Sequence, residues 1–397
     1  MKTTKKVVVV TPTFNEKGSI EKVIDLILEQ NGKIPGFDIH VLVSDSHSPD
    51  GTGEIVKKIA AKNMKVHFLD VYERGLGLAI IKGYEYALDK LNADVLMQID
   101  ADLQHNPNEI PLFLEKIAVG FEYVQGSRYI KGGENRISIT RQIFSFGASL
   151  ICRVMTGIWQ ISDFTPSYKA YDKNLYLRMN LSAIPWEGTT FLIQPAAIVE
   201  ADRAGAKMAE VPIKFNNRRV DRSKNEVVNY IIDILGYCLE IRLSKWGIKF
   251  PVLYWVRRSK TFIKFGMVGF AGTIVDFIFY NIFIGYFGFP PASAKGLSTE
   301  IAIFNNFTFN NIWTFKRRKT KNKLWKKFGI FNLVSFGGLA ISVVIIKLLH
   351  STYGDGIFLL GPLQIQFYNL YFFATIPLMM TWNFLMNHFV TWRHEED

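Results

Sequence analysis

Apolar and polar residues follow two different patterns along this chain, and the change between them divides it. Up to about Lys224, short apolar runs alternate with charged and turn-forming residues, as in a soluble domain. From Thr261 onward, long apolar and aromatic runs are joined by short polar loops. A chain of 397 residues has room for about two or three domains. We therefore expect a soluble domain over residues 1–226, an interfacial region over 227–260 and a transmembrane domain over 261–397.

Short apolar runs in the first part predict β-strands, because each run is bounded by turn residues. These runs lie at Val7–Val10, Ile39–Val43, Val66–Leu69 and Val95–Ile99. Helical periodicity fills the intervals, at Ser19–Glu29, Gly53–Lys62 and Leu78–Leu91. Strands that are apolar throughout are expected in a parallel sheet with helices on both faces. The predicted fold class is therefore α/β with a mainly parallel sheet, whose ligands bind at the carboxyl ends of the strands.

Long apolar segments in the second part predict transmembrane helices, since each approaches the roughly 20 residues that cross a bilayer. They lie at about Phe262–Phe287, Ser293–Phe315, Phe328–Leu349 and Phe367–Val390. Between the two parts, Val227–Val256 is apolar but is interrupted by Asp233, Glu240, Arg242 and Lys245. This mixture is typical of amphipathic helices that lie in the membrane interface.

Basic residues gather beside the apolar segments, and they supply much of the formal net charge of +12. Lys316–Lys327 is densely basic, whereas Gly288–Pro291 and Ser351–Gln366 contain no Lys or Arg. The positive-inside rule then places the soluble domain and both termini in the cytoplasm of a multi-pass membrane protein. The position of the charge favours the lipid bilayer as partner and argues against nucleic acid. No obligatory protein partner is indicated.

Several polar residues interrupt the predicted spans. The first span contains Asp276, and the second contains Glu300, Asn305, Asn306, Asn310 and Asn311. Hydrogen bonds between helices would explain them, and so would a polar path for a lipid head group. We favour hydrogen bonding for the asparagines and leave both explanations open for the acids.

Cysteine usage and the N-terminus bear on the cellular compartment. Cys152 and Cys238 are the only cysteines, which provides neither a zinc-site spacing nor a disulfide framework. The apolar run Val7–Val10 is too short for the core of a signal peptide. We therefore expect the soluble domain in a reducing compartment.

Two carboxylates follow the fourth predicted strand, in the sequence Asp100-Ala101-Asp102. Alternate residues of an extended chain point the same way, so both carboxylates can meet one cation. A divalent ion held by oxygen ligands can bridge two phosphates of a nucleoside diphosphate and neutralise the leaving group. Gln104 continues the alternation as a third candidate oxygen ligand. Asp-x-Asp also occurs in ordinary solvated turns, so the position at a strand end is what favours a metal site.

Polar residues also follow the first two strands. Pro12-Thr13-Phe14-Asn15-Glu16 places a carboxylate at a helix start, where it could equally be a cap. Asp45 ends the second strand and could bind a ribose or a base, or serve the turn with Asp50-Gly51. Gly75-Leu76-Gly77 lacks the third glycine of a dinucleotide-binding fingerprint, so that function is excluded.

Basic residues in later loops complete the candidate site. An arginine fork suits phosphate oxygens, and a lysine acts on them as a point charge. Each of these residues alone is more often a solvated surface charge. Together they could hold two phosphorylated substrates opposite a metal ion; they are Arg128, Arg141, Arg218 and Lys224.

These motifs occur in the order and near the spacing of family 2 glycosyltransferases, which the chain resembles over about residues 5–230. The motifs are Pro12–Glu16, Asp45 with Ser48–Thr52, Gly75–Gly77, Asp100–Asp102, Gly126–Tyr129, Glu210–Ile213, Arg218 and Ser223–Lys224. Within that family the chain is similar to the dolichol-phosphate mannose synthases. The second part is similar, in topology and basic loops, to the GtrA-type four-helix membrane domain.

The resemblance implies a GT-A fold and a metal-dependent enzyme that transfers mannose from GDP-mannose to dolichyl or another polyprenyl phosphate, with inversion. The product would be dolichyl β-D-mannosyl phosphate, and the cofactor Mn²⁺ or Mg²⁺. The nucleoside would be surrounded by Pro12, Phe14, Glu16, Val43 and Asp45. The metal and diphosphate would be held by Asp100, Ala101, Asp102 and Gln104, with Asp100, Asp102 and Gln104 as metal ligands. Asp102, Arg128, Arg218 and Lys224 would be catalytic, the three cations on donor or acceptor phosphate.

Two departures from the family pattern leave alternatives open. Asp45-Ser46-His47-Ser48 stands where the family commonly reads Asp-Asp-Gly-Ser, and Thr165-Pro166-Ser167-Tyr168-Lys169 where it often reads Thr-Ser-Gly-Phe-Arg. A UDP-glucose-dependent polyprenyl-phosphate glucosyltransferase would have the same architecture. A lipid-sugar translocator with a regulatory glycosyltransferase-like domain is a further alternative. A processive polysaccharide synthase is disfavoured, because its Gln-x-x-Arg-Trp motif is missing.

Overall fold

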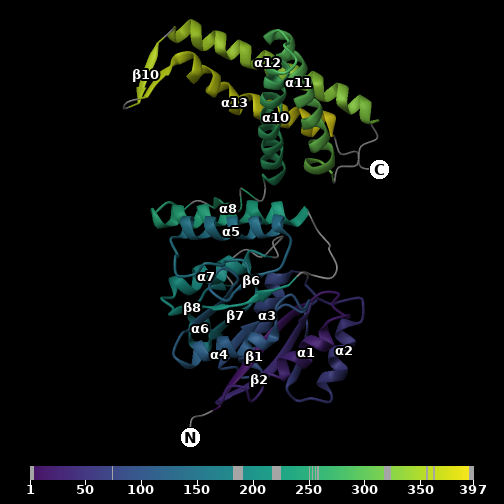
Figure 1. Cartoon of the computed structure of the whole chain (residues 1–397), viewed down its shortest axis with the longest axis vertical. Coiled ribbons are helices and arrows are strands. Elements are labelled where there is room, and N and C mark those ends of the chain that lie inside the picture. Colours follow the sequence, from purple (N-terminus) through teal and green to yellow (C-terminus); the bar gives the residue numbers. More distant parts are fainter. Residues whose placement is uncertain are drawn as a thin grey trace. The chain divides into compact units, whose positions relative to one another are not determined.

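The computed structural model divides the chain into two compact units, Met1–Trp255 and Val256–Asp397, each described by itself (Figure 1). It describes the chain apart from residues 1–3, 74, 182–190, 217–224, 250, 253, 255, 257–258, 317–322, 355, 361–362 and 393–397. Of the candidate site residues, Arg218 and Lys224 lie outside the described residues.

A seven-stranded sheet forms the centre of the first unit, in the order β3-β2-β1-β4-β7-β5-β8. Its strands are β1 (Lys5–Thr13), β2 (Phe37–Asp45), β3 (Val66–Asp70), β4 (Val95–Gln98), β5 (Tyr123–Ser127), β7 (Lys169–Asp172) and β8 (Met208–Pro212). Strand β7 runs antiparallel to both neighbours, and the other pairs are parallel. The carboxyl ends of β3, β2, β1 and β4 therefore meet at one edge of the sheet.

Helices cover both faces of the sheet, which explains why its central strands are apolar throughout. Val7 and Val9 pack with α1 (Ile20–Leu28), α2 (Thr52–Ala60) and α4 (Ile110–Ala118). Val8 and Val10 face α3 (Leu76–Asp89) and α7 (Ile193–Arg203). All four valines are completely buried. The predicted α/β class, with a mainly parallel sheet flanked by helices as in a GT-A fold, is confirmed.

The chain between β5 and α8 contains more regular structure than its sequence suggests. Strand β6 (Glu134–Asn135) pairs with β9 (Lys214–Phe215). Before β5, η1 (Pro107–Glu109) leads into α4. Helix α5 (Ile139–Thr156) precedes β7 and was not predicted from the sequence, and α6 (Lys173–Arg178) follows β7. Helix α8 (Asn225–Lys245) packs beside α5.

Four long helices make up most of the second unit. They are α10 (Lys260–Gly285), α11 (Pro291–Phe309), α12 (Leu324–Tyr353) and α13 (Phe367–Met386). The short π-helices η3 (Asn310–Thr314) and η4 (Asn387–Thr391) extend α11 and α13. Within the described residues, α10 is the one helix long and apolar enough to cross a membrane by length and composition. A hairpin of β10 (Ile357–Leu360) and β11 (Leu363–Gln366) occupies a stretch where a simple turn was expected.

Close packing and hydrogen bonds join α10 to α11. The Ser298 hydroxyl donates to Asp276 Oδ1 at 2.5 Å, across the two helices. A Cβ on Gly272 would lie 2.1 Å from Oδ1 of Asn306, so a larger residue there would have to displace the Asn306 side chain or separate the helices. These contacts favour interhelical hydrogen bonding as the reason for Asp276.

Candidate active site

Backbone N–H groups of the loop after β1 donate hydrogen bonds to side-chain hydroxyls of the segment after β2, at the carboxyl edge of the sheet. Asn15 N donates to Ser48 Oγ at 3.0 Å, and Glu16 N donates to Thr52 Oγ1 at 3.1 Å. Asn15 has φ of 59°, a left-handed conformation that asparagine tolerates better than most residues. The two motifs that the sequence assigned to the nucleoside therefore lie side by side.

The Asp45 carboxylate forms hydrogen bonds with residues of both of these motifs. Its Oδ1 accepts hydrogen bonds from Thr13 Oγ1 at 2.7 Å and Ser48 Oγ at 2.6 Å. Its Oδ2 accepts from Ser48 N at 2.8 Å. The carboxylate is almost completely buried. Turn formation, one of the two roles considered for Asp45, is thus observed, although with Ser48 in place of Asp50-Gly51, and contact with a nucleoside stays a prediction.

The other residues that the resemblance assigns to the nucleoside lie partly within strands β1 and β2 and partly in the loop after β1. Pro12 pairs with Ser44, and Val43 pairs with Thr11, both buried within strands. Phe14 is exposed at 43%. Glu16 Oε2 accepts a hydrogen bond from Ser19, the residue that precedes α1.

His47 and Tyr72 form an aromatic pair after β2 and β3, at the same edge of the sheet. The sequence had not indicated this pair. Their rings stack at 4.7 Å between centroids, and His47 Nδ1 lies 3.2 Å from Asp70 Oδ1. Both side chains are largely exposed. Asp45 and Asp70 are paired in the sheet, at the ends of β2 and β3. His47 and Tyr72, each two residues further along, are therefore neighbours.

Asp100 and Asp102 follow β4 at the same edge. Ala101 between them is buried, and both aspartates are partly buried. Strand β4 ends at Gln98 and residues 101–102 form a turn, so the extended chain on which the alternation was predicted does not reach the two aspartates. Asp100 Oδ2 accepts a hydrogen bond from Ser167 Oγ. Asp102 Oδ1 accepts from Gln104 N at 3.0 Å, across a turn in which Leu103 has φ of 61°. No cluster of three or more His, Cys, Asp or Glu suited to a metal ion occurs among the described residues.

Gln104 connects this loop to the strand segment that precedes residues 217–224. Its Nε2 donates to Asn216 O at 2.9 Å, and Asn216 N donates to Gln104 O at 3.0 Å. The chain that leads to Arg218 and Lys224 is thereby fixed beside the two aspartates as far as Asn216. Metal ligation by Gln104 stays a prediction.

His105 lies directly behind Asp100 and is almost completely buried. Its Nδ1 is 3.7 Å from Asp100 Oδ2, too long for a hydrogen bond. Neither ring nitrogen has a hydrogen-bond partner in the described part of the chain. The ring contacts Tyr168 and Phe215, and burial lowers the pKa of His105 to about 4. The imidazole is therefore neutral at physiological pH.

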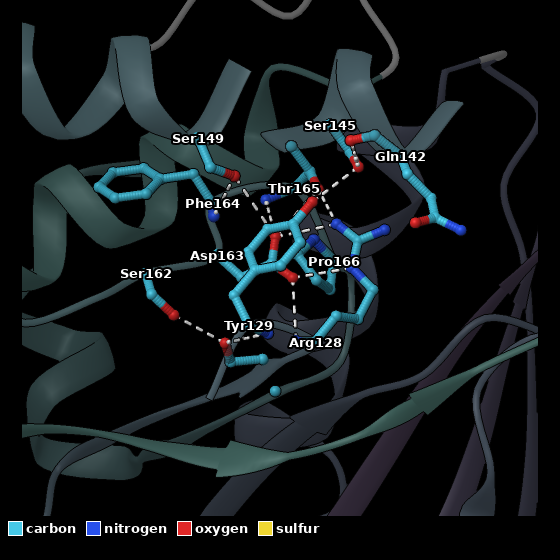
Figure 2. Close-up of polar contacts among 12 residues, drawn as sticks. Arg128, Tyr129, Gln142, Ser145, Ser149, Ser162, Asp163, Phe164, Thr165 and Pro166 are labelled. Atoms are coloured by element: carbon cyan, nitrogen blue, oxygen red, sulfur yellow. Dashed lines mark hydrogen bonds and ion pairs between the residues drawn. The ribbon is translucent and has the colours of Figure 1, made fainter. Parts of the chain in front are cut away.

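Arg128, directly after β5, is bound by a carboxylate that the sequence analysis missed (Figure 2). Its Nε donates to Asp163 Oδ2 at 2.8 Å and its Nη2 to Asp163 Oδ1 at 2.9 Å. Its backbone N also donates to Asp163 Oδ2, at 3.1 Å. Burial disfavours the charge of Arg128, but Asp163 outweighs burial and raises the pKa of Arg128. Arg128 therefore fastens the loop around Asp163 to the sheet, and phosphate contact stays a prediction.

Glu210 of β8 supports the same loop. Its Oε1 accepts from Ser162 N at 2.9 Å, Ser162 Oγ at 2.9 Å and Asp163 N at 3.2 Å. Burial raises the pKa of Glu210, and the bonds to Ser162 oppose that rise. The family motif at Glu210–Ile213 thus has a structural function in this chain.

Lys169 is a completely buried cation beneath the site. In the sheet it stands between Gln98 of β4 and Gln125 of β5. Its Nζ donates to Gln194 O at 3.4 Å. Burial lowers the pKa of Lys169 to about 7, while the charges of Asp100 and Asp163 oppose that fall. A lysine with a lowered pKa therefore occupies the position at which the family often has arginine.

The geometry defines a class of protein: an α/β enzyme with paired aspartates at the carboxyl edge of its sheet, continuous with a helical membrane unit. The sequence matches glycosyl transferase family 2 over residues 8–178 and the GtrA/DPMS transmembrane domain over residues 264–392. The chain belongs to glycosyl transferase family 2 and carries a GtrA/DPMS transmembrane domain. It is a glycosyltransferase and a membrane protein, which confirms both resemblances seen in the sequence.

The mannosyltransferase relatives cover between 61% and 86% of this chain. The dolichol-phosphate mannosyltransferase of Pyrococcus furiosus is 28% identical over 345 residues, covering 86% of this chain and 89% of that protein. The undecaprenyl-phosphate mannosyltransferase of Micrococcus luteus is 32% identical over 245 residues, covering 61% of this chain and 94% of that protein. Among solved structures, glucosyl-3-phosphoglycerate synthase of Mycobacterium tuberculosis is 21% identical with a TM-score of 0.45, covering 62% of this chain and 80% of that one.

Proposed function

We propose that this protein transfers mannose from GDP-mannose to the phosphate of dolichyl or another polyprenyl phosphate, with inversion at the sugar. The observation that carries the proposal is the position of Asp100 and Asp102 at the same sheet edge as the joined loops of Asn15 and Ser48. The names of the two mannosyltransferase relatives support the sugar and the lipid acceptor. The match to the Pyrococcus relative covers 345 residues, or 86% of this chain, and so extends beyond the first unit.

The donor binds with its nucleoside against the loops after β1 and β2 and its diphosphate beside Asp100 and Asp102. Pro12, Phe14, Glu16, Val43 and Asp45 are the proposed nucleoside contacts. Arg218 and Lys224, with the remaining donors of Arg128, are proposed to hold the phosphates of donor and acceptor, as guanidinium and ammonium groups do elsewhere.

In the reaction, an oxygen of the acceptor phosphate attacks the anomeric carbon of mannose, and the bond from that carbon to the diphosphate breaks. The phosphate nucleophile is already ionised near neutral pH, so a general base is unnecessary. The protein's contribution is to align two anionic substrates and to stabilise the leaving diphosphate. This requirement explains why the proposed site consists of cations and cation ligands.

A divalent cation, Mn²⁺ or Mg²⁺, fits the donor set of the loop after β4. Carboxylate oxygens are the ligands that these hard ions prefer, and Asp100 and Asp102 supply them from alternate positions. Ser167 and His105 both lie on the Oδ2 side of Asp100. When bound, the ion would neutralise the charge that develops on the leaving diphosphate.

We also propose that the first unit and both termini are cytoplasmic. The basic Lys316–Lys327 segment supports this orientation, since basic loops stay on the cytoplasmic side. Polyprenyl phosphate would then be used at the cytoplasmic face of the membrane.

A transfer assay tests the function. Full-length protein in vesicles containing dolichyl phosphate is given radiolabelled GDP-mannose, with Mn²⁺ or with a chelator. Lipid-linked label that requires the cation is expected, and GDP should protect the first unit from proteolysis better than UDP. Transfer from UDP-glucose in preference to GDP-mannose would contradict the donor. Flipping of a lipid-linked sugar with no transfer from either donor would contradict the enzyme function.

A further inference from the structure

Strands β1, β2 and β3 end in register at the carboxyl edge of the sheet. Thr13 pairs with Asp45, and Asp45 pairs with Asp70. Backbone hydrogen bonds continue this pairing by one residue. Ser46 N donates to Thr13 O at 2.9 Å. Val71 N donates to Asp45 O at 2.8 Å, so the segments after β1, β2 and β3 leave the sheet side by side.

Two aromatic side chains follow this row, His47 after β2 and Tyr72 after β3. Their rings stack at 4.7 Å between centroids, with 29° between the ring planes. The His47 side chain is 61% exposed, and Tyr72 is 75% exposed. Because the stack covers one face of each ring, the His47 ring keeps an open face.

The Asp70 carboxylate fixes the orientation of the His47 ring. His47 Nδ1 lies 3.2 Å from Asp70 Oδ1 and 3.3 Å from Asp70 Oδ2. Asp70 is itself held at the end of β3 by its pairing with Asp45. A ring that is already held by a stack and a hydrogen bond loses little conformational freedom when it binds a ligand.

His47 has a backbone conformation that favours glycine. Its φ of 52° lies in the left-handed region, which glycine adopts without steric cost and other residues adopt less often. Glycine also commonly stands at this position in the family pattern Asp-Asp-Gly-Ser. A side chain kept in an unfavourable conformation at the edge of a candidate site indicates that it contributes to binding.

The stacked pair adjoins the loops proposed to hold the nucleoside. Ser48 follows His47 directly in the chain, and its Oγ accepts the hydrogen bond from Asn15 N at 3.0 Å. The sheet order β3-β2-β1 places the segment of Tyr72 on one side of His47 and the loop of Asn15 on the other. Neighbouring strands are about 4.8 Å apart, so the imidazole is within reach of a base held by the first two loops.

We propose that His47 is a specificity-determining contact for the nucleotide donor, and that a purine base stacks on the ring face that Tyr72 leaves open. Bases bind aromatic side chains through their flat faces, and a purine offers two fused rings where a pyrimidine offers one. Tyr72 and Asp70 are positioning residues, because they hold the imidazole. The inference rests on the proposed function, in which the donor is a nucleoside diphosphate sugar, and it gives the site a physical reason to prefer GDP to UDP.

Calorimetric titration of full-length protein in detergent with GDP and with UDP, in the presence of Mn²⁺, tests the proposal. His47→Gly removes the ring and suits the left-handed backbone, so its unfolding temperature should not fall. Its dissociation constant for GDP should rise about tenfold, equivalent to about 1.4 kcal/mol, and that for UDP should rise less. Asn92→Gly is the matched control, because Asn92 is exposed, has φ of 54° and precedes β4 at the opposite edge of the sheet. Its affinity for GDP should equal that of wild type.

Variants of Tyr72 test the support of the imidazole. Tyr72→Phe keeps the ring beneath His47 and should bind GDP as wild type does, whereas Tyr72→Ala should lose several-fold. Unchanged GDP binding by His47→Gly would overturn the proposal, as would an equal loss in Asn92→Gly or an equal loss for GDP and UDP. Tighter binding of UDP than of GDP by wild type would also overturn it. Wild-type protein that binds neither nucleotide would overturn the proposed function itself, and this inference with it.

Discussion

The guanidinium of Arg128 meets the carboxylate of Asp163 with two parallel hydrogen bonds of 2.8 and 2.9 Å, and both side chains are buried. Removing one charge of such a pair leaves the other buried without compensation, at a cost of about 3–5 kcal/mol. We therefore expect Asp163→Asn to lower the thermal unfolding temperature of the first unit by several degrees. Glu54→Gln is the matched control, because Glu54 forms an exposed ion pair with Lys57 and should have little effect.

A double variant at Arg128 and Asp163 can distinguish a contribution to stability from a contribution to catalysis. Replacing both partners with apolar residues, as Arg128→Met with Asp163→Leu, removes both charges and should restore part of the stability lost in Asp163→Asn, since the backbone N of residue 128 still lacks its acceptor. If Arg128 also contacts a phosphate, this double variant stays inactive although it is folded. Recovery of mannosyl transfer along with stability would show that Arg128 serves only the fold.

Variants of His105 can also distinguish an effect on stability from an effect on catalysis. His105→Phe keeps the ring contacts with Tyr168 and Phe215 and removes two buried nitrogens that lack hydrogen bonds, so the unfolding temperature should not fall. The ring nitrogen 3.7 Å from Asp100 is lost as well. If that nitrogen orients Asp100, the cation concentration for half-maximal transfer should rise several-fold.

His105→Asn is the control for this experiment, since it retains a nitrogen donor and loses the ring. It should keep more of the cation affinity than His105→Phe and lose more stability. An unchanged cation dependence in His105→Phe would show that the imidazole only fills space.

Glu109 should make stability fall as pH rises from about 5 to about 7. Burial raises the pKa of Glu109 to about 7, above its value of 4.5 in the unfolded chain. Its contribution to stability is therefore complete below about pH 4.5 and is lost as pH rises through about 7. Glu109→Gln cannot ionise, so between pH 5 and pH 8 wild type should lose up to about 3 kcal/mol relative to this variant. Thermal unfolding of both proteins across that range measures the difference, and parallel curves would contradict it.

Gly272 sets the spacing of α10 and α11. A Cβ at this position would lie 2.1 to 2.6 Å from side-chain atoms of Asn306. Gly272→Leu should therefore separate the two helices and lower the yield of folded protein in detergent. Gly269→Leu is a control on the same helix, because a Cβ there meets nothing within 4 Å. Equal loss in both variants would indicate a general effect of bulk on α10.

The order of elements in the first unit could be predicted because its cause is local. Each predicted strand, such as Val7–Val10, is a short apolar run that both helical layers cover, and this burial is visible in the sequence itself. Helix α5 was missed because its buried positions include Ser149 and Thr156, which weaken the apolar period. The hairpin of β10 and β11 was missed because an apolar stretch after a membrane helix gives no signal for pairing.

Sequence reasoning identified candidate site residues that are close together in the sequence, and it missed contacts between residues that are far apart. Asp100 and Asp102 follow a strand, so their place at the carboxyl edge of the sheet could be predicted from the strand pattern. Asp163 lies 35 positions from Arg128, and no local pattern connects the two. Lys169 resembled a routine substitution until its complete burial was known. Distant partners of this kind depend on the folded topology, which sequence patterns alone do not specify.

The central claim is that Asp102 supports cation-dependent transfer of mannose to a lipid phosphate. The most direct test measures transfer from GDP-mannose to dolichyl phosphate by full-length wild type, Asp102→Asn and the control Glu54→Gln over a series of Mn²⁺ concentrations. We expect wild type and Glu54→Gln to be active in a saturable, cation-dependent way, and Asp102→Asn to lose at least about a hundredfold, the scale of about 2.7 kcal/mol of transition-state stabilisation, while it stays folded and membrane-inserted. Full transfer by Asp102→Asn without added cation would contradict the proposed site.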